Sequence, residues 1–233
     1  MLGIIGAMDR EVGFLTDAME ETSQRQIGYT RYTSGRLWGV PVCLARCGIG
    51  KVHAALCAQG MILLCGADAL LNIGVVGALR DSLAIGDLVI ARSAVQHDMD
   101  TTPIGDPPGL ISGPNLVHMP CDEALSALLV QAAMEAGLKA ERAAIATGDQ
   151  FIVGTEKKDF LSQAFDAAAC DMEGGAIAQC CYEMQVPYAA VRAISDTRDG
   201  DGREYEIKAA EACASEEKLL REFIALYRQD QKA

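Results

Sequence analysis

The chain begins with Met1-Leu-Gly-Ile-Ile-Gly-Ala-Met-Asp-Arg-Glu-Val12, which passes from an unbroken apolar run to a charged pattern. Residues 2–7 have the length and composition of a strand buried on both faces. Residues 9–19 place Val12 and Leu15 on one side of a helix. A buried strand followed directly by an amphipathic helix is the building unit of α/β sheets, so this opening predicts that fold class.

The same alternation of apolar runs and helical patterns continues along the chain. It predicts strands at residues 27–34, 40–47, 69–73, 88–95, 143–147, 167–172 and 189–194, and helices at residues 50–62, 122–137, 175–184 and 208–227. Residues 98–120 hold five of the seven prolines and predict a long loop of the kind that often carries function. The alternation indicates a mixed, mostly parallel central sheet with helices on both faces.

The composition excludes several classes of protein. Half of the 233 residues are hydrophobic, so a sizeable core is possible and wholesale disorder is excluded. The 20 Lys and Arg against 32 Asp and Glu give a net charge of -12, which speaks against nucleic acid or an anionic membrane as the main partner. The most apolar stretch, residues 61–79, is interrupted by Asp68 and Asn72 and makes a poor membrane span. Nine cysteines without a Cys-x-x-Cys pair suit buried, reduced thiols in a cytoplasmic protein.

Two short motifs resemble ligand-binding loops but lack the residues that such loops need. Gly48-Ile-Gly-Lys51 looks like the end of a phosphate-binding loop, yet Ala45 stands where the first glycine belongs and Val52 where Ser or Thr belongs. The EF-hand-like run at residues 199–203 places Arg203 where calcium needs an oxygen ligand. The sequence therefore predicts no metal site and no cofactor, and a turn at residues 199–203.

Three carboxylates fall at or just beyond the ends of predicted strands. Glu11 follows the first strand, Glu173 closes the strand near residue 172, and Asp196 closes the last strand. Each alone suits a helix cap or first-turn residue. Because ligands collect at the carboxyl ends of strands in open α/β sheets, the three together indicate a site. Phe151 and Ile152 follow another strand and offer either core packing or a stacking face for a planar ligand.

Seven blocks, in order along the chain, carry a more specific signal. They are Gly3-Ile-Ile-Gly-Ala-Met-Asp-Arg-Glu11-Val, Cys47-Gly-Ile-Gly-Lys51-Val, Asn72-Ile-Gly-Val-Val-Gly77, Gly86-Asp87-Leu-Val, Thr147-Gly-Asp-Gln-Phe151-Ile152, Asp171-Met172-Glu173-Gly and Arg192-Ala-Ile-Ser195-Asp196. Together they resemble the 5'-methylthioadenosine/S-adenosylhomocysteine nucleosidases of the nucleoside phosphorylase superfamily, from Leu2 to about Leu220. The resemblance implies a single three-layer α/β/α domain over residues 1–233, of nucleoside phosphorylase type, that forms a homodimer.

The resemblance also implies an activity, which is hydrolysis of the N-glycosidic bond of a small nucleoside to release adenine and a 5'-thioribose, as in methionine salvage. Glu11 matches the carboxylate that activates water. Asp196 matches the acid that protonates adenine at N7, with Ser195 orienting it. Such a proton is needed because adenine leaves poorly as an anion, while the ribosyl centre becomes oxocarbenium-like. Acid and base catalysis typically contribute on the order of 10²–10⁴ each.

The remaining matched positions are binding residues. Met172 and Glu173 match the ribose-binding pair, in which Glu173 holds the 2'- and 3'-hydroxyls. Further matches assign adenine stacking to Phe151, recognition of the adenine edge to the backbone of Ile152, a place beside the ribose to Arg192, a close backbone approach to the ligand to Gly77, and a ligand contact to Val75, where many relatives have serine.

Three other functions stay open at this point. Purine nucleoside phosphorylases use the same scaffold but bind phosphate with an Arg and a Ser, and the matching positions here are Asn72 and Val75. Neither can bind a dianion by charge, which favours water as the nucleophile. A nucleosidase acting on another 5'-modified nucleoside is the second alternative. The third is a non-catalytic adenosine-binding module, which would need neither Glu11 nor Asp196.

Overall fold

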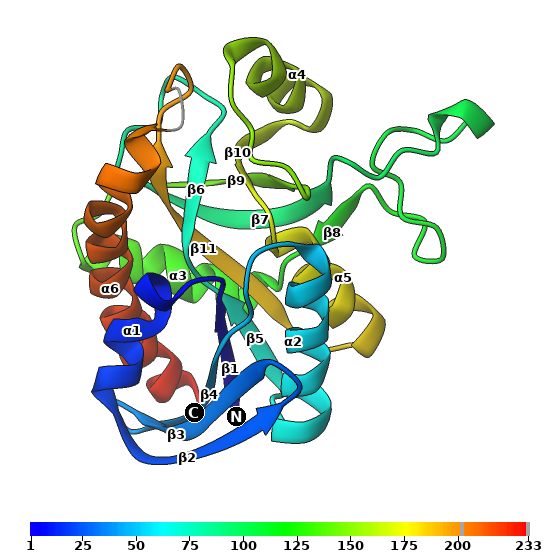
Figure 1. Ribbon diagram of the computed structural model, residues 1–233. Coiled ribbons are helices and arrows are strands. Elements are labelled where there is room, and N and C mark those ends of the chain that lie inside the picture. The colour runs from blue at the N-terminus through cyan, green and yellow to red at the C-terminus, as the bar shows by residue number, and fades with distance from the viewer. Residues whose placement is uncertain (201–202, 232–233) are drawn as a thin grey trace.

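The computed structural model of the protein describes residues 1–200 and 203–231, and it shows the α/β fold that the sequence predicts (Figure 1). The strands are β1 (Leu2–Gly6), β2 (Met19–Ile27), β3 (Thr30–Leu37), β4 (Val40–Arg46), β5 (Ala69–Asn72), β6 (Val75–Ala78), β7 (Leu88–Gln96), β8 (His118–Pro120), β9 (Ala140–Thr147), β10 (Ala167–Asp171) and β11 (Tyr188–Asp196). The helices are α1 (Asp9–Ala18), α2 (Lys51–Cys65), α3 (Glu123–Glu135), α4 (Thr155–Phe165), α5 (Gly174–Met184) and α6 (Arg203–Asp230).

The strands form one mixed sheet in the order β2-β3-β4-β1-β5-β11-β6-β10-β9-β7-β8. Strand β1 lies parallel between β4 and β5, and β11 continues this parallel part by pairing with β5. Strand β11 also pairs with β6 and with β7, and this last pairing closes β11, β6, β10, β9 and β7 into a ring. The long strand β11 therefore belongs to both parts of the sheet, and its carboxyl end, at Asp196, lies in the ring.

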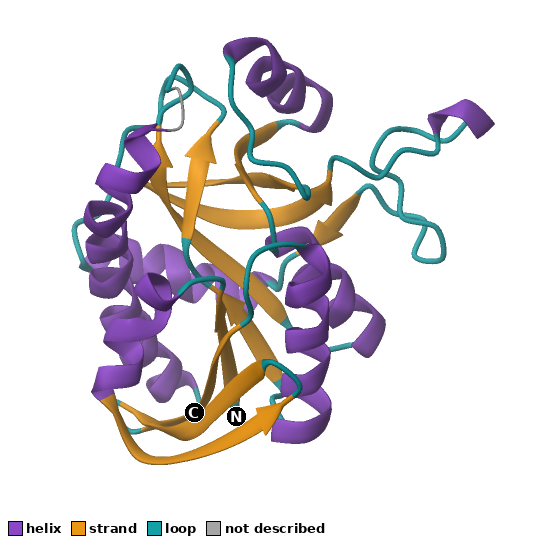
Figure 2. Cartoon of the chain, viewed as in Figure 1, coloured by secondary structure: helices purple, strands orange, loops and turns teal. Residues whose placement is uncertain are grey.

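Helices cover both faces of the sheet (Figure 2). On one side, α1, α3 and α6 pack over a core that includes Leu15, Leu129 and Phe223. On the other side, α2 and α5 pack together over a core that includes Met61 and Ile177. Helix α4 instead packs against β10 and β9 of the ring. Helix α3 begins as the sequence predicts, because the Asp122 side chain accepts a hydrogen bond from Leu125 N at 2.9 Å.

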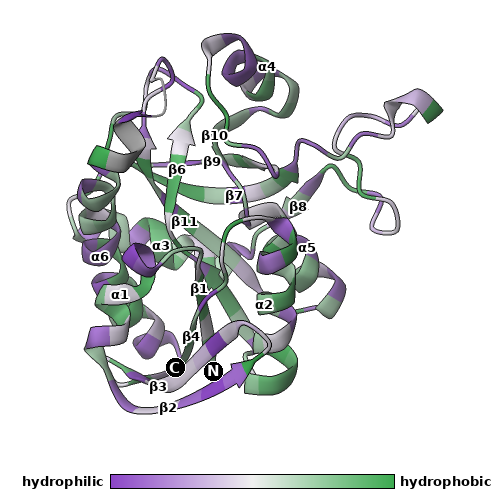
Figure 3. Cartoon of the chain, in the orientation of Figure 1, coloured by the Kyte–Doolittle hydropathy of each residue, from purple (hydrophilic) through white to green (hydrophobic). Residues whose placement is uncertain are grey.

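The first hairpin differs from the sequence-based expectation. The sequence predicts a strand at residues 27–34, but β2 and β3 form an additional hairpin with its turn at Gly28-Tyr29. The turn between β3 and β4 is only Trp38-Gly39, both with positive φ. Strand β2 is an edge strand whose residues are mostly exposed and polar, as its colour in Figure 3 also shows. It therefore lacks the apolar run by which a buried strand is recognised.

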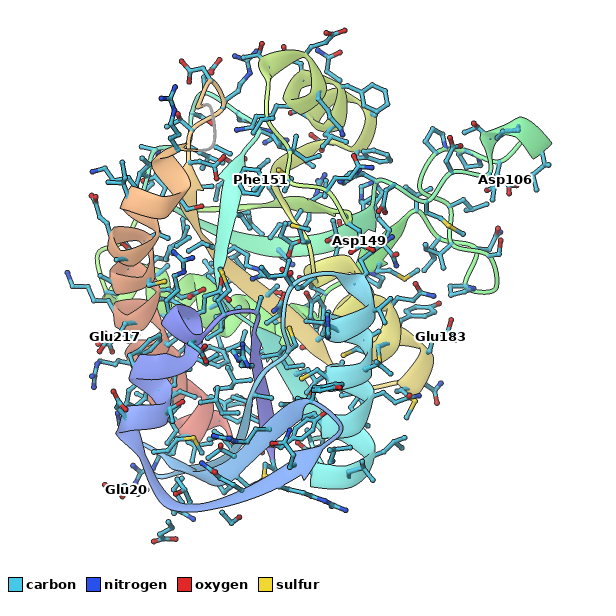
Figure 4. All side chains as sticks on the ribbon, in the orientation of Figure 1. Glu20, Asp106, Asp149, Phe151, Glu183 and Glu217 are labelled. Carbon is cyan, nitrogen blue, oxygen red and sulfur yellow. The ribbon has the colours of Figure 1, made fainter. Side chains whose placement is uncertain are left out.

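Three further elements, β6, β8 and α4, were not expected from the sequence. Strand β8 and a short 3₁₀ helix, Thr102–Ile104, lie within the proline-rich segment at residues 98–120. Most of this segment projects from the body as an arm, on which Asp106 lies far from the sheet (Figure 4). Of the turn expected at residues 199–203, Asp201 and Gly202 lie outside the described residues.

Two expectations from composition can be compared with the structure. All nine cysteines are free thiols, and seven of them are buried. Within residues 1–200 and 203–231, no helix has the length and apolar character needed to cross a bilayer.

Candidate active site

A cavity opens where β1, β10 and β11 end, beside β6 and the segment that follows β9. It is lined by Ala7, Met8, Glu11, Ile49, Val75, Val76, Gly77, Gln150, Phe151, Ile152, Cys170, Asp171, Met172, Glu173, Ser195 and Asp196. Nine of the ten site residues expected from the sequence are in this set, and the tenth, Arg192, is buried behind it. The carboxyl ends of separate strands thus bring together residues that are up to 185 positions apart, from Glu11 to Asp196.

Glu11 lies in the first turn of α1, directly after β1, and is buried. Its Oε2 atom accepts hydrogen bonds from Ala7 N at 2.6 Å and from Met8 N at 3.0 Å. Its Oε1 atom accepts one from Val75 N at 3.2 Å. Three backbone amides therefore fix both oxygens of the carboxylate, and Oε1, with a single donor, keeps capacity to accept a proton from a water molecule in the cavity.

Asp196 ends β11 at the wall of the cavity and is only 3% exposed. Ser195 Oγ lies 3.2 Å from Asp196 Oδ1 and 3.2 Å from the carbonyl oxygen of Val76. The other oxygen, Oδ2, lies 3.1 Å from Nζ of Lys158. The carboxyl group is thus held on both oxygens by side chains from two different elements.

Gly77 on β6 makes room for this carboxyl group. A Cβ atom built on Gly77 would lie 2.9 Å from Asp196 Oδ2, closer than real Cβ contacts, and 3.2 Å from Oδ1, which is unusually tight. The resemblance predicted a close approach of the Gly77 backbone to the ligand. The structure adds that the space beside Gly77 is occupied by the side chain of Asp196.

Glu173 precedes α5 and is also buried. Its Oε1 atom accepts a hydrogen bond from Gly50 N at 2.9 Å, and Oε2 lies 3.9 Å from Nη2 of Arg192. Burial raises the pKa of Glu173 to about 7, with the neighbouring Asp171 adding to the effect and Arg192 opposing it. Near neutral pH this carboxyl group therefore exchanges readily between an acceptor-only and a donor–acceptor form.

Arg192 is a buried anchor behind the cavity. Its Nη1 donates to Ile73 O at 2.7 Å, and its Nη2 donates to Asn72 Oδ1 at 2.6 Å and to Asp171 Oδ2 at 2.7 Å. Asn72 is thereby committed to Arg192 and does not face the cavity as a ligand group. Asp171 accepts further hydrogen bonds from Thr147 Oγ1 and Gly174 N. This network fixes the segment that carries Met172 and Glu173.

In the loop Gly48–Lys51, which resembles a phosphate-binding loop, the amides of Gly50 and Lys51 are directed at carboxylates. Gly50 N bonds to Glu173, and Lys51 N donates to Asp149 Oδ1 at 2.8 Å. The Lys51 ammonium pairs with Asp98 at 2.6 Å. Gly48 and Gly50 of this loop have φ angles of 92° and 99°, which residues other than glycine rarely adopt. The loop therefore ties α2 to the segment after β9 and supports Glu173.

Phe151 and Ile152 form the apolar wall of the cavity. Phe151 is 52% exposed and lines the cavity, so it is not a core aromatic. Ile152 and Val75 are buried at the cavity surface. Met172 and Glu173 also line the cavity.

Two buried charged residues near the site were not expected from the sequence. Lys158 lies on α4 and reaches Asp196. Glu216 lies on α6 and accepts a hydrogen bond from Gly74 N at 2.7 Å, and burial raises its pKa well above the usual range. A polar residue among the apolar positions of a helix was the available signal. Lys158 stands at i and i+3 spacing to Leu161, and Glu216 likewise to Leu219.

Comparisons with known proteins identify the family of this chain. The sequence profile of the phosphorylase superfamily matches residues 1–225. The 5'-methylthioadenosine/S-adenosylhomocysteine nucleosidase of Shewanella pealeana is 36% identical over 213 residues, which are 89% of this chain and 93% of the relative. The aminodeoxyfutalosine nucleosidase of Campylobacter jejuni subsp. jejuni is 36% identical over 205 residues, 88% and 89% of the two chains.

A solved structure shows that the fold is similar as well. The 5'-methylthioadenosine/S-adenosylhomocysteine nucleosidase of Neisseria meningitidis, in complex with methylthio-immucillin-A, superposes with a TM-score of 0.91 at 30% identity. The superposition covers 96% of this chain and 97% of the other. The chain therefore belongs to the phosphorylase superfamily, in the group that contains the 5'-methylthioadenosine/S-adenosylhomocysteine nucleosidases.

Proposed function

We propose that this protein hydrolyses the N-glycosidic bond of 5'-methylthioadenosine and S-adenosylhomocysteine, releasing adenine and a 5'-thioribose. Its cellular role would be methionine salvage in the cytoplasm. The observation that carries the proposal is the placement of Glu11 and Asp196, two buried carboxyl groups held by different partners, on the wall of one cavity. A pure adenosine-binding module would need no such pair.

The geometry supports a division of labour between the carboxyl groups. Asp196 donates a proton to N7 of adenine, so that the base leaves as a neutral molecule. Glu11 takes a proton from water as the water oxygen bonds to C1' of the ribose. Glu173 accepts hydrogen bonds from the ribose hydroxyls and interacts more strongly as the ring becomes cationic, which favours the transition state over the substrate.

Water, rather than phosphate, is the nucleophile that the cavity suits. Among the described residues that line it, four are carboxylic acids, namely Glu11, Asp171, Glu173 and Asp196, and none is Lys or Arg. Asn72 bonds to Arg192, and Val75 offers an apolar side chain whose amide is bonded to Glu11. A phosphate dianion would therefore meet like charges without a cationic partner.

An adenine-release assay tests this function. With 5'-methylthioadenosine or S-adenosylhomocysteine, we expect the same initial rate in phosphate-free buffer and in buffer with added phosphate. The sugar product should be the free 5'-thioribose. Strict dependence on phosphate, with a ribose 1-phosphate as product, would show a phosphorylase instead. Saturable adenosine binding without any release of adenine would show a binding module.

Another 5'-modified nucleoside is the second candidate substrate. The Campylobacter jejuni relative, which is as similar to this chain as the Shewanella pealeana relative, is named an aminodeoxyfutalosine nucleosidase. The same assay with aminodeoxyfutalosine, compared by kcat/KM with the two thioether substrates, separates the alternatives. A kcat/KM for aminodeoxyfutalosine at least tenfold above both thioethers, a difference of about 1.4 kcal/mol in transition-state binding, would assign that substrate.

The protein is also proposed to form a homodimer through α2. Val52, Leu56 and Leu63 lie on one face of this helix and are each more than 60% exposed. Ile49, just before the helix, is also exposed and lines the cavity, so the apolar face continues into the site. Light scattering should give twice the chain mass of 24.7 kDa. Leu56→Glu should shift the protein to the monomer, and a monomeric wild type would contradict the proposal.

A further inference from the structure

The proposed acid, Asp196, has a buried lysine as its neighbour. Lys158 comes from α4, is fully buried, and places Nζ 3.1 Å from Asp196 Oδ2 and 2.7 Å from the carbonyl oxygen of Thr197. A charged ammonium group is costly to bury unless it is paired. Asp196 provides that pairing, and the two groups together are neutral in the ion-paired form.

The pairing conflicts with the simplest account of the acid. Asp196 has to carry a proton before it can protonate the leaving base, but an ammonium group 3.1 Å away favours the ionised carboxylate. The conflict disappears if the proton is counted for the pair. The ion-paired form, ammonium and carboxylate, and the neutral form, amine and carboxylic acid, hold the same number of protons. The two forms differ only in whether the shared proton is on Lys158 or on Asp196.

We propose that Lys158 stores the proton that Asp196 passes to the base. This inference rests on the proposed nucleosidase reaction. In the step, the Lys158 ammonium gives a proton to Asp196 Oδ2 and becomes a neutral amine, while Asp196 gives a proton to N7 as the C1'–N9 bond breaks. Glu11 gains the proton of the attacking water. After the products leave, Glu11 releases a proton to solvent and the Lys158–Asp196 pair regains one, so that charges and atoms balance.

Few other groups around the Lys158–Asp196 pair gain or lose a proton in the pH range in which the enzyme would be assayed. Cys170 on β10 faces both residues, and burial raises its pKa to about 12, so its thiol stays protonated. Gly77 on β6 presents no side chain. Glu11 and Glu173 face the cavity, and Glu173, with a pKa of about 7, contributes equally to wild type and variants. Arg198, just beyond β11, is paired with Asp159.

The proposal predicts how two substitutions change the pH profile. A carboxylic acid in water loses its proton near pH about 4, a lysine ammonium near pH about 10, and a guanidinium only above pH about 12. Lys158→Met leaves Asp196 to hold the proton alone. The pH above which activity falls should therefore be at least about one unit lower in this variant than in the wild type. Lys158→Arg keeps the positive charge but does not give up its proton, so adenine release should fall by roughly 10²–10⁴ at pH 7–9.

The experiment compares two substrates with leaving groups that differ in their need for a proton. One is 5'-methylthioadenosine, and the other is 4-nitrophenyl 5-methylthioribofuranoside, whose nitrophenolate leaves as an anion. For the second substrate, both variants should stay within about threefold of the wild type, which also shows that they are folded. Lys218→Met, at an exposed lysine on α6, is the matched control and should leave both pH profiles unchanged.

Three results would overturn the proposal. They are an alkaline limb of Lys158→Met that coincides with that of the wild type, full activity of Lys158→Arg on 5'-methylthioadenosine, and an equal loss on both substrates in either variant. The last result would mean that Lys158 only supports the fold of the site. Failure of the wild type to release adenine would instead contradict the proposed function, so the two proposals fail in different ways.

Discussion

Asp196→Asn is expected to lower kcat for adenine release by roughly 10²–10⁴, with a much smaller effect on ligand binding. The amide has nearly the size of the carboxyl group and fits the same space beside Gly77 and Ser195. It has no acidic proton to give to N7, so the base would have to leave as an anion. Steady-state kinetics with 5'-methylthioadenosine and the dissociation constant of a non-hydrolysable analogue measure the two effects separately.

The control for Asp196→Asn follows from its neighbours. The substitution leaves the Lys158 ammonium facing an amide instead of a carboxylate, so some loss of stability is expected as well. Thermal unfolding must therefore show that the variant is folded at the assay temperature. Turnover within about threefold of the wild type in a folded Asp196→Asn variant would show that another group is the acid.

Much of the site could be predicted because strand ends converge. Glu11, Glu173 and Asp196 each follow or end a buried apolar strand, and such strands are easy to recognise in the sequence. In a sheet with parallel central strands their carboxyl ends meet on one side. Their place on one cavity follows from this rule, although they are far apart along the chain.

The partners of these carboxylates were harder to predict. Lys158 and Glu216 are charged residues at buried helix positions, and a hydropathy pattern predicts that such residues are exposed to solvent. Only the three-dimensional structure shows that each meets a partner, Asp196 for Lys158 and the amide of Gly74 for Glu216. The match of Asn72 to a phosphate-binding position of the purine nucleoside phosphorylases likewise gave no hint that it binds Arg192.

Strand β2 and the ring of strands show a second limit of sequence patterns. Strand β2 is held by its backbone pairing with β3 and exposes most of its side chains, so its sequence carries no apolar signal. The ring depends on β11 pairing with β7 as well as with β6, and no local pattern encodes which distant strands meet. The pairing of β11 with β6 places Asp196 opposite Gly77.

Glu11→Gln is expected to lower kcat by roughly 10²–10⁴, because a neutral amide cannot take the proton from water. It should also destabilise the protein by about 1–3 kcal/mol. Both oxygens of Glu11 accept hydrogen bonds from backbone amides, at Ala7 and Met8 on one side and Val75 on the other. The NH₂ group of glutamine must face one of these donors and leave it unpaired. Kinetics and chemical denaturation measure the two losses.

The matched control for Glu11 is Asp9→Asn, since Asp9 is another carboxylate in the first turn of α1 but its side chain is 88% exposed. Its only ion pair, among the described residues, is a surface contact with Arg46 at 3.2 Å, so activity and stability should hardly change.

In the double variant of Glu11→Gln and Asp196→Asn, the loss of kcat should be smaller than the product of the single losses, because both groups act on one transition state. Losses that multiply fully would show that Glu11 and Asp196 contribute independently to the rate. Activity of Glu11→Gln equal to that of Asp9→Asn would remove Glu11 from the mechanism.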